Sequence, residues 1–207
     1  MTTPGARDRA AGQAPATQSG APRAAASVID APAAAVEVAV EVTLEIAAPA
    51  DRVYALIADL PGMADLSPEC ARVSWIPPAT AAVPGAQFRG VNRHGPFRWV
   101  TICTVERAEP GRELVFSVRS HGLPVARWRY RIVETSVGCT VVESTEDLRG
   151  LFARLAGPLV SGVSDRAARN AVTMRGTLAR LKERAEGSTA ADPTAADPTA
   201  ADPTALA

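Results

Sequence analysis

Alternating apolar and polar residues open the patterned part of this chain. From residue 36 to residue 46, valine, leucine and isoleucine occupy every second position, mostly separated by glutamate and threonine. Side chains of a strand point alternately to its two faces, so this run predicts a strand with one buried face. Apolar residues at helical spacing within 51–57 predict a helix, which Pro61-Gly62 ends, and a second short helix is expected through Leu66.

Six further extended runs follow, separated by glycine and proline turns. Closely spaced strands joined by such turns predict an antiparallel meander. The runs are residues 71–76, 87–94, 97–108, 113–119, 125–133 and 140–146.

The last patterned segment, 158–186, has the period of one helical face. Charged residues, Arg166 among them, fall on the opposite side and are expected in solvent. Pro158 suits the first turn, and Gly187 suits the end of a single helix. At about 1.5 Å per residue, this helix would span roughly 40 Å. The apolar or small positions are Val163, Ala167, Asn170, Met174, Leu178 and Leu181.

An apolar helix face of that length must pack against another element of similar length, and a sheet built from the preceding strands is the only candidate. The expected architecture is therefore α+β, with a curved antiparallel sheet of about seven strands around one long C-terminal helix. A cavity for a small molecule is expected between the two.

The two ends of the 207-residue chain have no such pattern. Residues 1–34 are rich in alanine, proline and small polar residues, and residues 188–207 repeat Thr-Ala-Ala-Asp-Pro. Frequent proline stops helix growth, and neither end can build a core, so both are expected to be disordered tails. One domain, 35–187, remains.

Charge and cysteine content narrow the class of function. The 22 basic and 22 acidic residues cancel, which argues against nucleic acid as a partner. Cys70, Cys103 and Cys139 are widely spaced and lack metal-ligand grouping, so buried thiols in a reducing cytoplasm are expected, with no metal and no cofactor. No run approaches the roughly 20 apolar residues of a membrane span, so stable membrane insertion is not expected.

Several local motifs add a family resemblance. They include Ile46 to Asp59, Ser67 to Cys70, Pro84 to Gly90, Val105 to Gly111 and Trp128-Arg-Tyr. With the element order, they make residues 35–186 resemble the START-like (SRPBCC) superfamily, which includes polyketide cyclase/dehydrase and lipid-transfer-like proteins. The resemblance implies the helix-grip fold and a hydrophobic small molecule as partner.

Strand parity predicts which side chains face the helix. On residues 125–133, the apolar positions must face inward, which leaves the alternating arginines outside, paired with carboxylates of adjacent strands. The same argument, with three helical positions added, gives the expected cavity. Its residues are Met63, Phe88, Asn92, Trp99, Thr101, Phe116, Trp128, Tyr130, Glu143, Asn170 and Met174.

Four polar residues in or near this set are open to two interpretations. Asn92 either binds a ligand or bonds to turn backbone, and Asn170 either binds a ligand or bonds to the sheet. His94 shares the side of Phe88 but precedes Gly95-Pro96, so it is either a catalytic or a turn histidine. Glu143 follows two adjacent valines and can face either way; the resemblance favours inward.

Three functions are consistent with these patterns. The first is binding of a lipid, polyketide or other aromatic molecule in the cavity. The second is polyketide cyclase-like catalysis of aldol cyclisation and dehydration, with Asn92, Tyr130, His94 and Glu143 as candidate catalytic residues. The third is a protein-interaction module. No stronger catalytic signature, such as GxSxG, HExxH or a P-loop, is present in the sequence.

Overall fold

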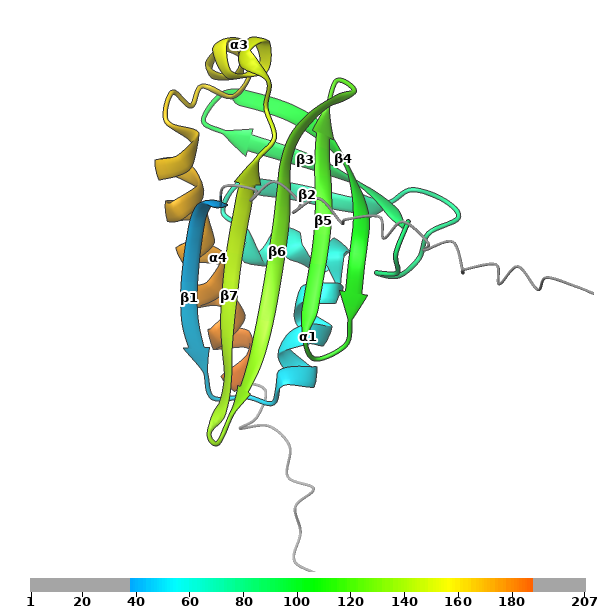
Figure 1. Cartoon of the computed structure of the whole chain (residues 1–207), viewed down its shortest axis with the longest axis vertical. Helices are drawn as coiled ribbons and strands as arrows, with labels where there is room; N and C mark the ends of the chain where they lie inside the picture. Colours follow the sequence, from blue (N-terminus) through cyan, green and yellow to red (C-terminus); the bar gives the residue numbers. More distant parts are fainter. Residues whose placement is uncertain (1–37, 188–207) are drawn as a thin grey trace, which may run out of the picture. The chain divides into compact units, whose positions relative to one another are not determined.

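The computed structural model describes residues 38–187. The predicted tails, 1–34 and 188–207, lie outside the described residues. The chain runs through one strand, short helices, six strands and two helices (Figure 1). The strands are β1 (Val38–Ile46), β2 (Cys70–Trp75), β3 (Gln87–His94), β4 (Phe97–Glu109), β5 (Glu113–Ser120), β6 (Leu123–Thr135) and β7 (Gly138–Asp147). The helices are α1 (Ala50–Ala58), the 3-10 turn η1 (Leu60–Gly62), α2 (Met63–Leu66), α3 (Leu151–Ser161) and α4 (Arg166–Gly187).

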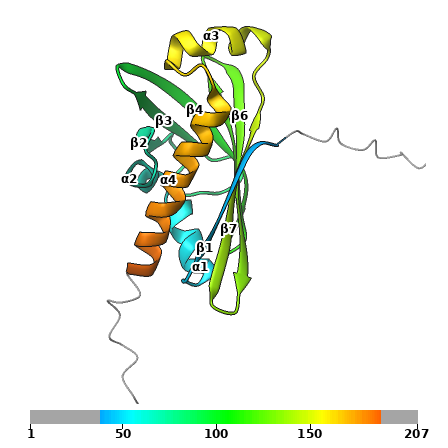
Figure 2. The same cartoon turned by 90° about the vertical axis from the view of Figure 1, so that its left-hand side faces the viewer.

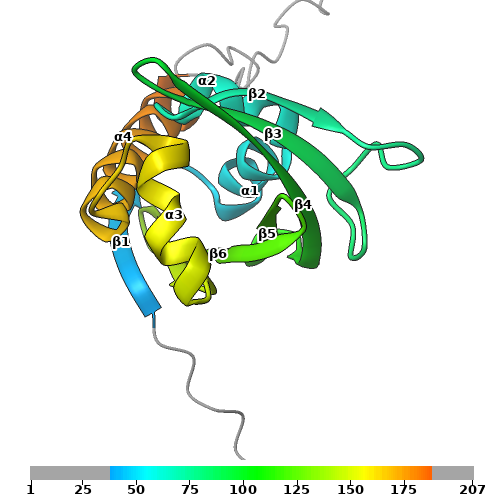
Figure 3. The same ribbon diagram turned by 90° about the horizontal axis from the view of Figure 1, so that it is seen from above.

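All seven strands form one antiparallel sheet in the order β1-β7-β6-β5-β4-β3-β2. The meander predicted from the glycine and proline turns is confirmed for β2 to β7, and β1 adds to the β7 edge. The sheet curves around α1, α2 and α4, with α3 across one end (Figure 3). This is the predicted α+β helix-grip fold.

The outer face of β6 carries the arginines that alternate with its buried residues. Arg127 donates to Glu106 at 2.8 Å and to Glu146 at 3.0 Å, and Arg129 lies 3.4 Å from Glu113. Glu146 on β7 and Glu113 on β5 belong to the two strands beside β6, so the predicted pairing with carboxylates of adjacent strands is confirmed for these two arginines, whereas Glu106 lies on β4, one strand further away.

The prediction of one unbroken helix over 158–186 is wrong. Gly162 adopts a left-handed conformation with φ of 66° and ends α3, and its N–H donates to the Pro158 carbonyl at 2.8 Å. Asp165 then starts α4, because its side chain accepts from the Ala168 N–H at 2.9 Å. Pro158 therefore lies inside α3 and not at the start of the long helix.

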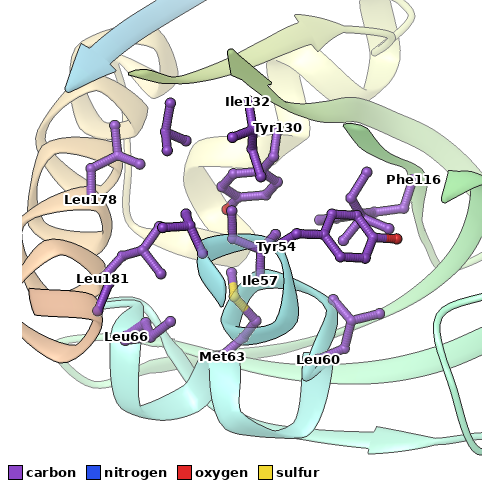
Figure 4. Close-up of a cluster of buried hydrophobic side chains, with 14 of the residues drawn as sticks. Tyr54, Ile57, Leu60, Met63, Leu66, Phe116, Tyr130, Ile132, Leu178 and Leu181 are labelled. Atoms are coloured by element: carbon purple, nitrogen blue, oxygen red, sulfur yellow. The ribbon is translucent and has the colours of Figure 1, made fainter. Parts of the chain in front are cut away.

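The hydrophobic core lies between α1, α4 and the sheet. Figure 4 shows Leu178 and Leu181 of α4 pointing toward Ile57 of α1 and Tyr130 of β6. Leu114, Leu181 and Val53 have no exposed surface, which is the close packing expected of a domain core. No helix within residues 38–187 is long and apolar enough to cross a bilayer.

Candidate ligand-binding site

A cavity of about 590 Å³ lies between the sheet and α4. Its volume is within the range of small-molecule sites, and most of its wall is apolar. Phe88 and Phe116 pack edge to face in that wall, with ring centroids 5.3 Å apart. The exposed side chains of Leu123 and Phe152 also line it, so it opens at the end of the sheet that α3 covers.

The structure brings most of the predicted cavity residues together. Met174 is the exception: it is buried but does not line the cavity. The face of α4 toward the cavity carries Asn170, Thr173 and Thr177, and Met174 is rotated about 100° from Thr173. The lining residues that the sequence predicted are Met63, Phe88, Asn92, Trp99, Thr101, Phe116, Trp128, Tyr130, Glu143 and Asn170. That these residues contact a ligand stays a prediction.

Glu143 faces the cavity and pairs with Tyr130. The two residues are opposite each other in the β6–β7 ladder, and the Tyr130 hydroxyl donates to Glu143 Oε1 at 2.8 Å. Glu143 is only 1% exposed. Within the described residues, its second oxygen, Oε2, is one of two buried side-chain atoms without a hydrogen-bond partner.

Burial keeps this pair protonated at neutral pH. Desolvation raises the pKa of Glu143 to about 8, and the hydrogen bond from Tyr130 offsets only part of the rise. Burial and the adjacent carboxyl group raise the pKa of Tyr130 well above its ordinary value. With Oε1 accepting from Tyr130, a protonated Oε2 can donate to an acceptor in the cavity.

A second polar group lies on the β3–β4 part of the wall. Asn92 Nδ2 donates to Thr101 Oγ1 at 3.3 Å, so its partner is a cavity-lining hydroxyl and not turn backbone. Gly90 leaves room for this pair, because a Cβ there would stand 2.8 Å from Thr101 Oγ1.

Glu69, Arg166 and Trp99 form a cluster at the cavity edge that the sequence did not reveal. Arg166 Nη1 lies 2.8 Å from Glu69 Oε1, and the guanidinium stands 5.3 Å from the centroid of the Trp99 ring. The expectation that Arg166 is solvated is wrong, because these contacts leave its side chain 21% exposed. The cluster joins the start of α4 to β4 and to the segment before β2.

Helix α3 supplies another part of the wall. Ala153, Ala156, Gly157 and Val160 recur at helical spacing and face the cavity. The sequence carries this signal in residues 151–160, but α3 was not among the predicted elements.

His94 lies outside the cavity lining. Its Nδ1 is 3.3 Å from the carbonyl oxygen of Ser161, which can only accept, so the ring donates and links the β3–β4 turn to the end of α3. The predicted catalytic alternative for His94 therefore has no support in its position.

All three cysteines are free thiols. Cys103 and Cys139 are buried as expected, whereas Cys70 is partly exposed, which corrects the prediction for that residue. Burial raises the pKa of Cys103 to about 12, so its thiol stays protonated at neutral pH. Within residues 38–187, no three His, Cys, Asp or Glu side chains are grouped closely enough to hold a metal ion.

Comparison with solved structures finds the same fold at low sequence identity. Protein CV1439 from Chromobacterium violaceum has a TM-score of 0.55 and 12% identity, over 71% of this chain and 96% of that one. The di-domain aromatase/cyclase StfQ of the steffimycin pathway has a TM-score of 0.55 and 17% identity, over 73% of this chain and 51% of StfQ.

A second di-domain aromatase/cyclase, BexL of the BE-7585A pathway, has a TM-score of 0.53 and 25% identity. The match covers 71% of this chain and 49% of BexL, so this chain spans about half of each di-domain protein. No curated protein matches the chain.

The sequence model of one family, described as polyketide cyclase / dehydrase and lipid transport, matches residues 37–186. That range includes every strand and helix described above except the last residue of α4. The chain therefore belongs to the polyketide cyclase / dehydrase and lipid transport family.

Proposed function

We propose that this protein binds an uncharged, largely apolar small molecule in the cavity, with one hydrogen-bonding group of the ligand at Glu143. The observation that carries the proposal is Glu143 Oε2, a buried polar atom that has no partner among the described residues and lies in an otherwise mostly apolar wall. Leaving such an atom unpaired costs about 1–3 kcal/mol, which a ligand acceptor would recover.

The protonation state of Glu143 indicates the ligand's chemistry. Because its pKa is about 8, the carboxyl group is mainly neutral at pH 7 and donates from Oε2. A carbonyl or hydroxyl oxygen on an aromatic or lipid-like body would accept this hydrogen bond. The apolar wall supplies the remaining affinity through burial of apolar surface.

Native mass spectrometry of the purified full chain, followed by solvent extraction, tests this proposal. The expected result is a discrete bound compound, or a mass shift with a panel of neutral aromatic and lipid compounds. Trp128→Ala should weaken this binding by about tenfold, because Trp128 lines the cavity.

Trp75→Ala is the matched control, since Trp75 is also partly buried but does not line this cavity. It should leave binding unchanged. An unliganded mass and no shift across the whole panel would contradict the proposal.

Cyclase-like catalysis is the second candidate, and the Tyr130–Glu143 pair and the 25% identity to BexL favour it. In an aldol closure, protonated Glu143 would give its proton to the ketone oxygen as the new carbon–carbon bond forms. The attacking carbon would react as its enol, and the resulting carboxylate would take the proton from the enol oxygen as that oxygen becomes a carbonyl, so the protons balance.

This second function predicts a specific pH profile. Turnover of a poly-β-ketone substrate should fall as the pH rises through about 8, where Glu143 loses its proton, and Glu143→Gln should abolish turnover. Ligand binding without any turnover would contradict this second function and leave ligand binding as the only proposed function.

A further inference from the structure

Helix α3 is apolar on two opposite faces. One face lines the cavity, and the other carries four large side chains that are 71–82% exposed; one of the four, Phe152, lies at the border of the two faces and also lines the cavity mouth. These four residues fall within about 100° of one another around the helix axis. They are Leu151, Phe152, Leu155 and Leu159. Several large apolar side chains exposed on one helix face mark an interaction site, so the outer face of α3 needs a covering partner.

Other segments present apolar side chains at the same end of the domain. Leu123 at the β5–β6 turn is 45% exposed, and Phe97 at the β3–β4 turn is 37% exposed. Figure 2 shows α3 lying across this end, above the β3–β4 strands and the start of α4. Phe97, Leu123 and the four exposed residues of α3 together form the α3 surface.

The charge around the α3 surface is strongly positive. The surrounding segments, 93–98, 119–123 and 147–169, contain seven arginines and two aspartates. Glu69, which pairs with Arg166, adds one more negative charge, so an excess of four positive charges remains. The arginines are Arg93, Arg98, Arg119, Arg149, Arg154, Arg166 and Arg169.

We infer that the α3 surface docks this protein on the surface of an anionic lipid bilayer. An amphipathic helix lying in the plane of the interface inserts Leu and Phe among the acyl chains, while nearby arginines meet the anionic headgroups. The four exposed residues lie on one face of an 11-residue helix, which suits a planar partner. The cavity opens beside the same helix, so docking would bring its mouth to the lipid.

Vesicle co-sedimentation of the full chain tests the inference. The vesicles contain phosphatidylglycerol and phosphatidylcholine in equal amounts, or phosphatidylcholine alone. The protein should sediment with the anionic vesicles at least about tenfold more strongly than with the neutral ones, and 0.5 M salt should weaken this binding, because salt screens the arginines.

A matched pair of variants locates the contact. Leu159→Glu should reduce vesicle binding about tenfold or more, because it places a carboxylate on the inserted face. Val137→Glu makes a similar change at the β6–β7 turn, at the opposite end of the sheet (Figure 1), and should leave binding intact. The two residues are 82% and 80% exposed, so neither change disturbs the core. Arg93→Ala with Arg98→Ala should weaken binding to anionic vesicles only.

Three results would overturn the inference. The first is no binding to either vesicle, and the second is equal binding to both. The third is a wild-type dimer in analytical ultracentrifugation that Leu159→Glu dissociates, since a second copy would then cover the α3 surface. The inference does not depend on what the cavity holds.

Discussion

The two halves of α4 are both buried against the same sheet, yet they do different things. Toward its C-terminus, Leu178, Leu181 and Ala185 are 0–1% exposed and pack in the core. Toward its N-terminus, Asn170, Thr173 and Thr177 are 3–9% exposed and line the cavity. Burial alone therefore does not separate core from site; the polarity of the buried face does.

The threonines show how a polar helix face can line an apolar cavity. Thr173 Oγ1 donates to the Asn170 carbonyl at 3.0 Å, and Thr177 Oγ1 donates to the Thr173 carbonyl at 3.0 Å. Their hydroxyls are satisfied within α4 and require nothing from a ligand. Glu143 Oε2, which is not satisfied among the described residues, is a buried polar atom left for recognition.

The largest expected effect tests the core half. Leu181→Ala should lower the free energy of unfolding by about 2–5 kcal/mol, because it removes a fully buried side chain and leaves a cavity in close packing. Urea denaturation measures this loss. Val172→Ala, at an exposed position of the same helix, should stay within about 0.5 kcal/mol. Similar losses for both variants would mean that this half of α4 is not a packed core.

The next effect concerns the buried acid in the cavity half. The pKa of Glu143 is about 8 in the folded chain and near its ordinary value of 4.5 when unfolded. A raised pKa means that its contribution to stability is fully present below about pH 4.5 and is lost as the pH rises toward 8. Glu143→Gln cannot ionise and avoids this loss.

The stability of Glu143→Gln relative to wild type should therefore increase by roughly 2–4 kcal/mol between pH 4.5 and pH 8. Urea denaturation at a series of pH values measures the difference. A difference that stays flat across this range would show that Glu143 is not a buried, destabilised carboxylate at high pH.

The smallest effect compares two arginines on α4. Arg166→Ala removes the contacts to Glu69 and Trp99 and should speed ligand release a few-fold, at a stability cost of about 1 kcal/mol or less. Arg184, whose exposed pair with Asp65 spans 3.6 Å at the other end of α4, is the matched control. Stopped-flow displacement of a neutral fluorophore measures the rate of ligand release from the Arg166→Ala and Arg184→Ala variants. Equal release rates would mean that the Glu69–Arg166–Trp99 cluster does not retain the ligand.

The strands were predictable from local pattern alone. Alternation and glycine or proline turns place β3 at residues 87–94, which the structure matches, and most other strand ends agree within about two residues. The break before α4 was not predictable in this way. Val163 and Ala167 keep the phase of the helical stripe across Gly162, so the periodicity continues where the helix does not.

The site was less predictable, because it depends on contacts between distant segments. Val141 and Val142 are both buried although successive residues of β7 point to opposite faces, and their adjacency hides which way Glu143 points. Glu69 and Arg166 are 97 residues apart, and no local pattern relates them. Strand parity did recover the β3, β4 and β6 side chains, because alternation fixes a face once a single residue on the strand is placed.

The claim that the cavity is a ligand site is tested most directly by filling it. Ala126 is buried on β6 and lines the cavity, so Ala126→Trp would occupy space that a ligand needs. Titration of wild type and Ala126→Trp with the neutral fluorophore N-phenyl-1-naphthylamine should give saturable binding to wild type and at least about tenfold weaker binding to the folded variant. Equal binding to the two proteins would place the ligand elsewhere and contradict the account.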